Sequence, residues 1–288
     1  MKRISWILLL CLCTAMTWAQ AKKPLELKDV VTGTFRPDNI YGVIPIPGDG
    51  EHYTQMNAQG TQIIKYSFKT GKEVEVIFDV TPIYRHSYTA MHYLYSLKRN
   101  LDGKIRNKLE KLSDGGPQQA PVFSPDGSMV AFVRDNNIFL VKRYFGNSES
   151  QVTEDGKRNK IINGIPDWVY EEEFAFDRAL EFSADSKMLA YIRFDESQVS
   201  SYSFPLFAGA APRMDAFAKY PGEYTYKYPK TGEPNSKVSV HTFDIKSKVT
   251  RKMQVPLESD GYIPRIRFTQ DPTKLAIMTL NRAARYVN

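Results

Sequence analysis

The chain has 288 residues, of which 42% are hydrophobic and 25% are charged, with 17 glycines and 17 prolines. This composition is typical of a globular protein with a sizeable core and excludes a disordered, collagen-like or coiled-coil chain. The net charge of +7 is modest, and the Lys and Arg residues are scattered along the chain. We therefore expect no nucleic acid among the partners.

Residues 1–21 have the order of a secretory signal peptide. Lys2 and Arg3 give a positive start, an apolar run follows at 6–13, and small residues lie around Ala19 and Ala21. A transmembrane helix needs about 20 apolar residues, which this run does not reach. We expect cleavage near Ala19 or Ala21 and export of residues 22–288.

Both cysteines of the chain, Cys11 and Cys13, lie in this segment. Each follows a leucine, whereas a lipoprotein anchor requires a small residue before the cysteine. The exported part would have no thiol, and thus no disulfide, zinc–cysteine site or cysteine nucleophile.

The exported part consists of short strand patterns separated by turns. One motif occurs three times, at 123–134, 182–193 and 268–279. Each copy predicts a buried aromatic residue, a turn around an Asp and a strand with a closely packed Ala. The last two copies are further apart than the first two, which predicts an insertion between them.

Hairpins are predicted at 64–76, 93–103 and 240–249 between these copies. Repeated strand–turn–strand units predict an all-β fold, a β-propeller. A β-sandwich is the alternative, but it does not explain the repeated turn. The length allows about four or five blades. Because an unclosed propeller leaves an unpaired sheet edge, we expect the chain to be the front portion of a longer protein.

The sequence lacks the common catalytic and ligand-binding motifs. It contains no Gly-x-Ser-x-Gly, no His-Glu-x-x-His and no phosphate-binding glycine loop. We interpret the four histidines as ordinary loop or strand residues. No catalytic residue, metal site or cofactor is predicted.

One acidic segment, 164–178, interrupts the strand pattern. Asp167 can cap a short helix by accepting a backbone N–H of the first turn. The glutamates at 171–173 would then lie near the positive end of this helix. The residues expected to anchor it on the propeller are apolar or aromatic: Trp168, Val169 and Phe174.

Three consecutive carboxylates on a helix cannot all face one way, but two neighbours can converge on one point. Two close carboxylates repel unless a cation lies between them, and an ammonium group with its three donors suits that place. The pattern indicates a site for a primary amine, without deciding between 171/172 and 172/173. A solvated acidic turn is the alternative.

A second cluster is Tyr84-Arg85-His86-Ser87-Tyr88-Thr89-Ala90. Tyr88 and Thr89 suit a strand, and Arg85 would lie at its entry. A guanidinium there can bind a carbonyl or a carboxylate. A surface salt bridge is the alternative.

These two segments, 167–174 and 85–90, together resemble the dipeptidyl peptidase IV family of serine exopeptidases. The resemblance extends through 123–127, 192–196 and 227–232, and so covers most of the exported part. It implies an eight-bladed propeller, of which this chain is the N-terminal part, joined to an α/β-hydrolase domain that this chain lacks. With no further cysteines and with an export signal, the chain resembles the bacterial, Bacteroidetes-type members of the family. We therefore expect it in the periplasm or at the cell surface.

The resemblance also implies roles for single residues. Glu172 and Glu173 would bind the N-terminal ammonium of the substrate, and Arg85 would hold the carbonyl between its first two residues. Four motif residues would support them, Glu171 structurally and the others by positioning the motif: Asp167, Trp168, Tyr170 and Glu171.

The implied activity is the release of Xaa-Pro or Xaa-Ala dipeptides from free peptide N-termini, without a cofactor. The catalytic Ser, Asp and His would lie outside this chain, so the chain alone is expected to be inactive. The resemblance also allows a homodimer of the full-length protein. The alternatives are a non-catalytic peptide-binding propeller and a tripeptidyl peptidase of the same family.

Overall fold

The computed structural model describes residues 26–28, 42–95, 109–209, 215–283 and 287. The chain divides into two units, Met1–Ile44 and Pro45–Asn288. The signal peptide expected at 1–21 lies outside the described residues. In the first unit only 26–28 and 42–44 are described, and the account below concerns the second.

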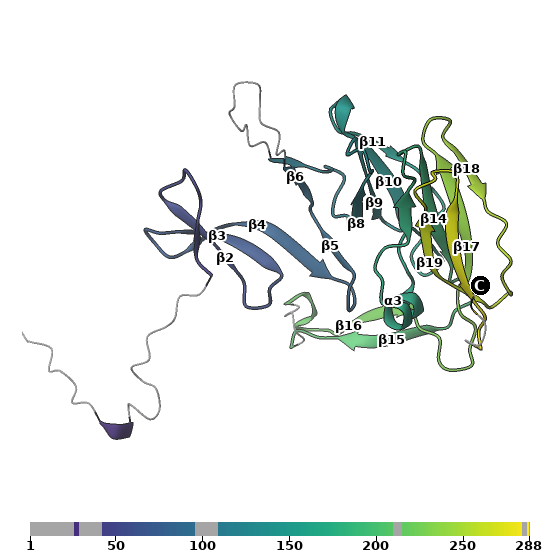
Figure 1. The fold of residues 1–288 in the computed structure, drawn as a ribbon. Coiled ribbons are helices and arrows are strands. Elements are labelled where there is room, and N and C mark those ends of the chain that lie inside the picture. The colour runs from purple at the N-terminus through teal and green to yellow at the C-terminus, as the bar shows by residue number, and fades with distance from the viewer. Residues whose placement is uncertain (1–25, 29–41, 96–108, 210–214, 284–286, 288) are drawn as a thin grey trace, which may run out of the picture. The chain divides into compact units, whose positions relative to one another are not determined.

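The second unit is built almost entirely of antiparallel strands (Figure 1). The strands before the first repeat are β1 (Ile44–Pro45), β2 (His52–Met56), β3 (Gln62–Ser67), β4 (Glu73–Pro82), β5 (Tyr88–Ala90), β6 (Tyr93–Tyr95) and β7 (Leu109–Lys111). The next blade contains β8 (Gln119–Phe123), β9 (Met129–Arg134), β10 (Asn137–Lys142) and β11 (Ser148–Gln151), with the short helix η1 (Arg143–Phe145). The following elements are β12 (Ile161–Asn163), α3 (Trp168–Phe174), β13 (Leu180–Phe182), β14 (Met188–Asp195), β15 (Ser201–Leu206), η2 (Asp215–Phe217), β16 (Gly222–Lys227), β17 (Lys237–Asp244), β18 (Val249–Lys252), β19 (Tyr262–Phe268) and β20 (Leu275–Leu280).

The fold is an all-β partial propeller, as predicted. Strands β8 to β11 form one four-stranded blade, and β13, β14, β17 and β18 form another, which β12 joins at the end of β14. The predicted hairpins at 64–76 and 240–249 are β3–β4 and β17–β18. At 93–103, β6 pairs instead with β7, and the turn between them lies outside the described residues. The part of the chain that the structure describes contains no α/β-hydrolase domain.

The three repeats are the turns of the hairpins β8–β9, β13–β14 and β19–β20. In each turn the Asp accepts hydrogen bonds from nearby groups: Asp126 from the Ser124 hydroxyl (2.6 Å), Asp185 from the Ser183 hydroxyl (2.7 Å), and Asp271 from the Thr273 amide (3.0 Å). The hydroxyl of Ser124, followed by the amide of Ser128, lowers the pKa of Asp126 to about 2. The repeated sequence therefore encodes a repeated turn.

Two details of the repeat prediction are wrong. Phe123 was expected to be buried but is 52% exposed, and the Arg143 guanidinium lies 5.9 Å from the centre of its ring. Ala276 in the third copy is exposed, whereas Ala131 and Ala190 in the first two are fully buried. Ala276 lies in β20, whose only partner strand within the described residues is β19, whereas the strands that carry Ala131 and Ala190 are paired on both sides.

The main core lies between the two four-stranded blades and β19. Its buried members come chiefly from β9, β10, β14 and β17. Tyr170 of α3 is completely buried in this core, 4.9 Å from the ring of Phe194. Its hydroxyl oxygen accepts a hydrogen bond from the Ile263 amide (3.0 Å), so one side chain ties α3 to β14 and β19. Burial raises the pKa of Tyr170 far above its usual range.

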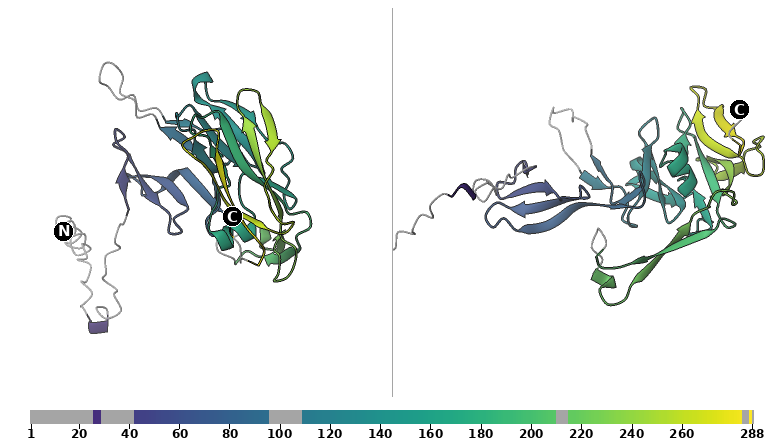
Figure 2. Two further views of the ribbon diagram at one scale, coloured as in Figure 1. Left: turned by 45° about the vertical axis from the view of Figure 1, so that its right-hand side comes forward. Right: turned by 90° about the horizontal axis from the view of Figure 1, so that it is seen from below.

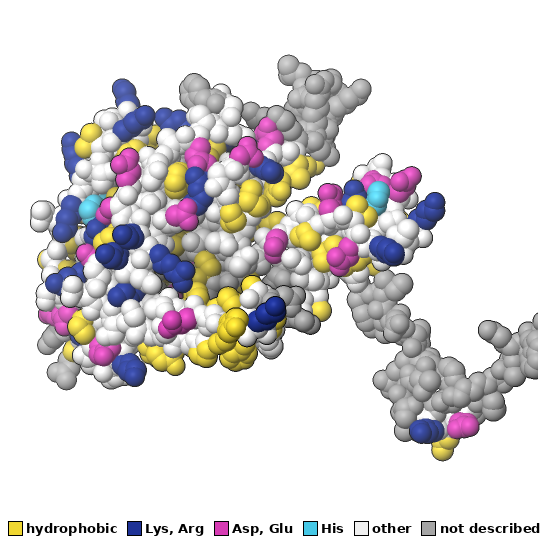
Figure 3. Space-filling view, turned by 180° about the vertical axis from the view of Figure 1, so that it is seen from behind, with side chains coloured by type: hydrophobic (Ala, Val, Ile, Leu, Met, Phe, Trp, Pro, Cys, Tyr) yellow, Lys and Arg dark blue, Asp and Glu magenta, His cyan; other side chains and the backbone are white. Residues whose placement is uncertain are grey.

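The predicted insertion between the second and third repeats is the hairpin β15–β16. It leaves the blade between β14 and β17 and extends away from it (Figure 2). Aromatic side chains from both strands lie along the hairpin, and hydrophobic side chains gather over it at the lower edge of Figure 3. The aromatic side chains are Tyr202, Phe204, Tyr224 and Tyr226.

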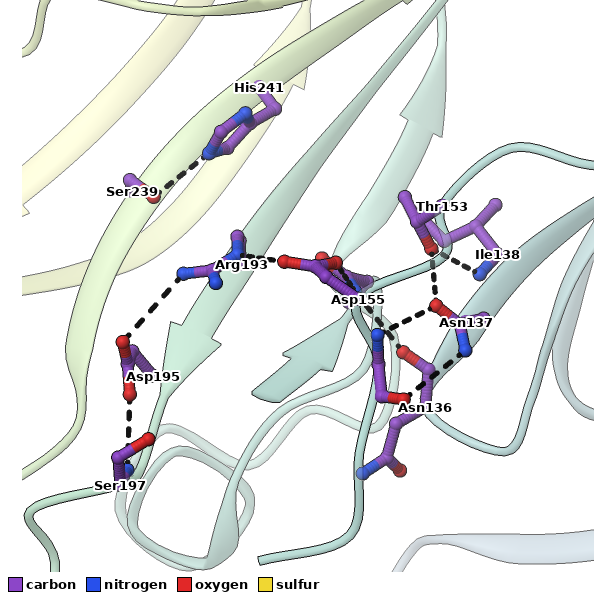
Figure 4. A network of polar contacts seen from close by, with 12 residues as sticks. Asn136, Asn137, Ile138, Thr153, Asp155, Arg193, Asp195, Ser197, Ser239 and His241 are labelled. Atoms are coloured by element: carbon purple, nitrogen blue, oxygen red, sulfur yellow. Dashed lines mark hydrogen bonds and ion pairs between the residues drawn. The ribbon is translucent and has the colours of Figure 1, made fainter. Parts of the chain in front are cut away.

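A polar network fastens the segment that leads into α3 (Figure 4). Asp155 accepts hydrogen bonds from Nε of Arg193 on β14 (2.7 Å) and from Nδ2 of Asn163 (2.9 Å). The same Asn163 amide reaches the carbonyl of Asn136 in the β9–β10 turn (3.3 Å). Both four-stranded blades thus hold Asn163, the residue directly before the acidic segment 164–178.

Candidate functional site

The site is formed where the loop between β4 and β5 meets helix α3. The loop closes on itself because the amides of Ile83 and Tyr84 both donate to the carbonyl of Ser87 (2.9 and 3.3 Å). Arg85 stands at the tip of this loop, before β5, as the sequence predicts. The helix supplies Glu171 and Glu172, which contact the loop across more than 80 residues of sequence.

Asp167 begins the helix as the sequence predicts. Its Oδ1 accepts a hydrogen bond from the Tyr170 amide (2.9 Å), which is the N-cap geometry. Its Oδ2 accepts one from the Ser236 hydroxyl (2.5 Å), just before β17. Burial raises the pKa of Asp167 above its usual range, against the lowering effect of Ser236. The cap therefore fixes α3 to the blade as well as starting it.

Glu171 is buried and points into the loop. Its Oε1 accepts hydrogen bonds from the amides of His86 (2.7 Å) and Ser87 (2.8 Å), and its Oε2 accepts one from the Ser87 hydroxyl (2.7 Å). Three donors thus satisfy a carboxylate that is only 4% exposed. This arrangement fits a structural role and leaves little room for a ligand at Glu171.

Glu172 lies at the edge of the same loop, where one of its oxygens receives two donors. Its Oε2 is 2.6 Å from Nε of Arg85 and 2.9 Å from the hydroxyl of Tyr84. No residue in the described ranges donates to its other oxygen, Oε1. The Tyr84 hydroxyl, and after it the Glu172 carboxylate, raise the pKa of Arg85. The structure therefore brings Arg85 and Glu172 into direct contact.

Glu173 is exposed and does not contact Arg85. Among the residues that the structure describes, it has no hydrogen bond or ion pair. Successive helix positions differ in direction by about 100°, which separates Glu171 in the loop from Glu173 at the surface. Glu172 lies between them. Its Oε1 and the exposed Glu173 carboxylate, which have no donor among the described residues, therefore belong to adjacent residues.

The aromatic residues of the motif hold α3 in place. Trp168 is partly buried, and its ring lies 5.9 Å from that of Tyr84 and 4.4 Å from that of Tyr228. Val169 and Phe174 pack against the core as predicted. The motif therefore connects the Arg85 loop, the core and the end of the β15–β16 hairpin.

A cavity of about 370 Å³ is lined by Tyr84, Trp168 and Glu171 but not by Arg85, Glu172 or Glu173. Aromatic side chains line one part of it: Tyr84, Trp168, Phe204, Tyr224 and Tyr226. Glu196, which follows β14 and is 5% exposed, faces it together with Lys227. Burial, and then the charge of Asp167, raise the pKa of Glu196 to about 7.

Two of these features were not predicted from the sequence. Tyr84 lies in the predicted cluster 84–90 without a role of its own, and Glu196 lies in the segment 192–196, which only carries part of the resemblance. The hydrogen-bond partner of Tyr84 is 88 residues away, so the local sequence carries no signal for this contact. Within the described ranges there is no cluster of three or more metal-ligating side chains and no helix long and apolar enough to cross a membrane.

Comparison with known proteins shows the family of the chain. The family model of the dipeptidyl peptidase IV N-terminal region matches residues 69–288. The chain belongs to this family. The crystal structure of Porphyromonas gingivalis dipeptidyl peptidase 4 is similar with a TM-score of 0.63 and 41% identity, over 90% of this chain and 39% of that one.

The curated relatives include proteins from animals and fungi. Human prolyl endopeptidase FAP is 31% identical over 77% of this chain. Probable dipeptidyl-aminopeptidase B of Talaromyces stipitatus is 32% identical over 73% of this chain. The match spans 30% of the human protein and 23% of the fungal one, so this chain corresponds to a minor part of each.

Proposed function

We propose that this chain is the substrate-recognition part of an exported serine dipeptidyl peptidase. Glu172 and Glu173 bind the N-terminal ammonium of a peptide, and Arg85 binds the carbonyl between its first two residues. A further domain supplies the nucleophile, because the sequence itself contains no nucleophile elbow. Xaa-Pro and Xaa-Ala dipeptides are the expected products.

The contact between Arg85 and Glu172 is the observation that carries this proposal. Nε of Arg85 holds one oxygen of Glu172 at 2.6 Å, and the terminal nitrogens of the guanidinium have no partner among the described residues. These nitrogens can donate to a carbonyl while Nε retains the carboxylate. The open oxygen of Glu172 and the carboxylate of Glu173 offer acceptors for an ammonium group.

Such a clamp measures a substrate from its amino end. A charge-assisted hydrogen bond between an ammonium and a carboxylate is stronger than one between neutral groups, and a blocked N-terminus loses it. Binding the amine on one side and the first carbonyl on the other fixes how far the peptide enters. Cleavage after a set number of residues follows from that limit.

The direct test is product analysis with the intact gene product. A synthetic decapeptide with Pro at its second position and a free N-terminus is incubated with the protein, and the products are identified by mass spectrometry. Release of the N-terminal dipeptide, together with no cleavage of the N-acetylated peptide, supports the proposal. Release of a tripeptide, or no cleavage of either peptide, contradicts it.

Cleavage of the N-acetylated peptide would indicate an endopeptidase, the activity in the name of the human relative. Because the clamp requires a free amine, this result would also contradict the proposal.

A further inference from the structure

Tyr84 is the second donor to the oxygen of Glu172 that Arg85 holds. Its hydroxyl is 2.9 Å from Oε2 of Glu172, while Nε of Arg85 is 2.6 Å from the same atom and 3.4 Å from the hydroxyl. Tyrosine, arginine and glutamate thus form a closed triangle of polar contacts. Two donors on one oxygen restrict the rotation of the carboxylate, and its Oε1 has no donor among the described residues.

The ring of Tyr84 is itself held in place. It lies 5.9 Å from the ring of Trp168, which in turn lies 4.4 Å from Tyr228. The Arg85 guanidinium is 5.8 Å from the centre of the Tyr84 ring. These contacts restrict the phenol ring, so its hydroxyl is preorganised to meet Glu172.

Arg85 is less suited to hold Glu172 alone. Its side chain is 64% exposed, and the role proposed for it requires its guanidinium to engage the substrate as well. An exposed arginine loses much rotamer freedom when it is fixed in one geometry. Tyr84 is half-buried and carries fewer rotatable bonds, and the proposed function assigns it no contact with the substrate.

We infer that Tyr84 is a positioning residue for the binding of the substrate amine. It acts through Glu172: its hydroxyl retains Oε2 when Arg85 turns towards the substrate carbonyl, so that Oε1 stays directed at the ammonium group. This inference rests on the function proposed above.

The test is Tyr84→Phe in the intact gene product, because phenylalanine keeps the ring contact with Trp168 and removes only the hydroxyl. With a chromogenic Gly-Pro amide we expect KM to rise about 3- to 10-fold, the range of one hydrogen bond, with kcat changed less than 2-fold. The inhibition constant of the free dipeptide Gly-Pro should rise by the same factor. That of N-acetyl-Gly-Pro, which has no ammonium, should not change.

Tyr144→Phe is the matched control, because Tyr144 of η1 is 74% exposed and does not line the cavity beside Tyr84. We expect it to leave KM unchanged. The inhibition constants do not depend on the fraction of folded enzyme, so they remain informative if Tyr84→Phe lowers the yield of folded protein.

A double-mutant cycle with Glu172→Ala separates the inference from the proposed function. If Tyr84 acts through Glu172, then Tyr84→Phe has no further effect on KM in the Glu172→Ala background. An equal effect in both backgrounds, or an unchanged KM in the single variant, would overturn the inference. An unchanged kcat/KM in both Glu172→Ala and Glu173→Ala would instead overturn the proposed function.

Discussion

Ser87 donates to both oxygens of Glu171, through its backbone amide to Oε1 at 2.8 Å and through its hydroxyl to Oε2 at 2.7 Å. The His86 amide is a third donor, so one buried carboxylate accepts three hydrogen bonds from the loop before β5. Because Arg85 precedes these residues directly, the place of its guanidinium depends on a glutamate of α3.

Glu171→Gln should therefore loosen the Arg85 loop. The amide presents its NH2 group to the Ser87 hydroxyl, which loses the acceptor for its own proton, and the negative charge that strengthens the two backbone contacts is removed. We expect the free energy of unfolding to fall by about 1.5–3 kcal/mol, the range for hydrogen bonds to a charged group. Urea denaturation measures this change.

Ser87→Ala is the milder companion variant, because it removes one of the three donors and leaves the two amide contacts. We expect it to cost about 0.5–1.5 kcal/mol. A loss as large as that of Glu171→Gln would show that the hydroxyl, and not the pair of amides, holds the loop.

Tyr170→Phe tests the connection between α3 and β19. The variant keeps the buried ring but leaves the Ile263 amide without the oxygen that accepts its hydrogen bond at 3.0 Å. A buried donor without a partner costs about 1–3 kcal/mol, which thermal denaturation detects as a lower melting temperature. The control is Tyr262→Phe, whose hydroxyl meets an Asn235 side chain that is only half-buried. If the two variants lost equal stability, the buried contact would have no special importance.

Glu196 should make stability depend on pH below neutrality. Burial and the negative charge of Asp167 raise its pKa from 4.5 to about 7 in the folded protein, whereas Lys227 and the Asn159 amide act in the opposite direction. The folded state thus holds a proton that the unfolded state releases. The stabilising contribution is complete below about pH 4.5 and is lost as the pH rises through about 7, with an amplitude on the order of 3 kcal/mol.

Measurement of unfolding free energies from pH 4.5 to 8 in the wild type and in Glu196→Gln tests this dependence. The glutamine cannot ionise, so the part of the slope that Glu196 contributes should disappear. Glu223→Gln, a change at an exposed glutamate of β16, should keep the wild-type slope. Equal slopes in all three proteins would show that Glu196 titrates at its ordinary pKa.

Local patterns predicted the features of this fold that depend on neighbouring residues. The Asp-centred turns, the N-cap at Asp167 and the insertion between the second and third repeats were all predictable, because each depends on residues within one turn or on the spacing of repeats. The exposure of Phe123 was not, since burial depends on which segment covers a position. The pairing of Glu171 with Ser87 and of Tyr84 with Glu172 depends on how a loop and a helix more than 80 residues apart meet, which no local pattern contains.

The central claim is that Glu172 and Glu173 recognise the free amine of a peptide. The measurement that tests it most directly is kcat/KM of the intact gene product on a chromogenic Gly-Pro amide, in Glu172→Ala and Glu173→Ala, with the exposed Glu223→Ala as control. We predict a loss of about 10- to 100-fold in each of the first two variants, equivalent to one charge-assisted hydrogen bond, and no loss in the control. An unchanged kcat/KM in both Glu172→Ala and Glu173→Ala would contradict the claim.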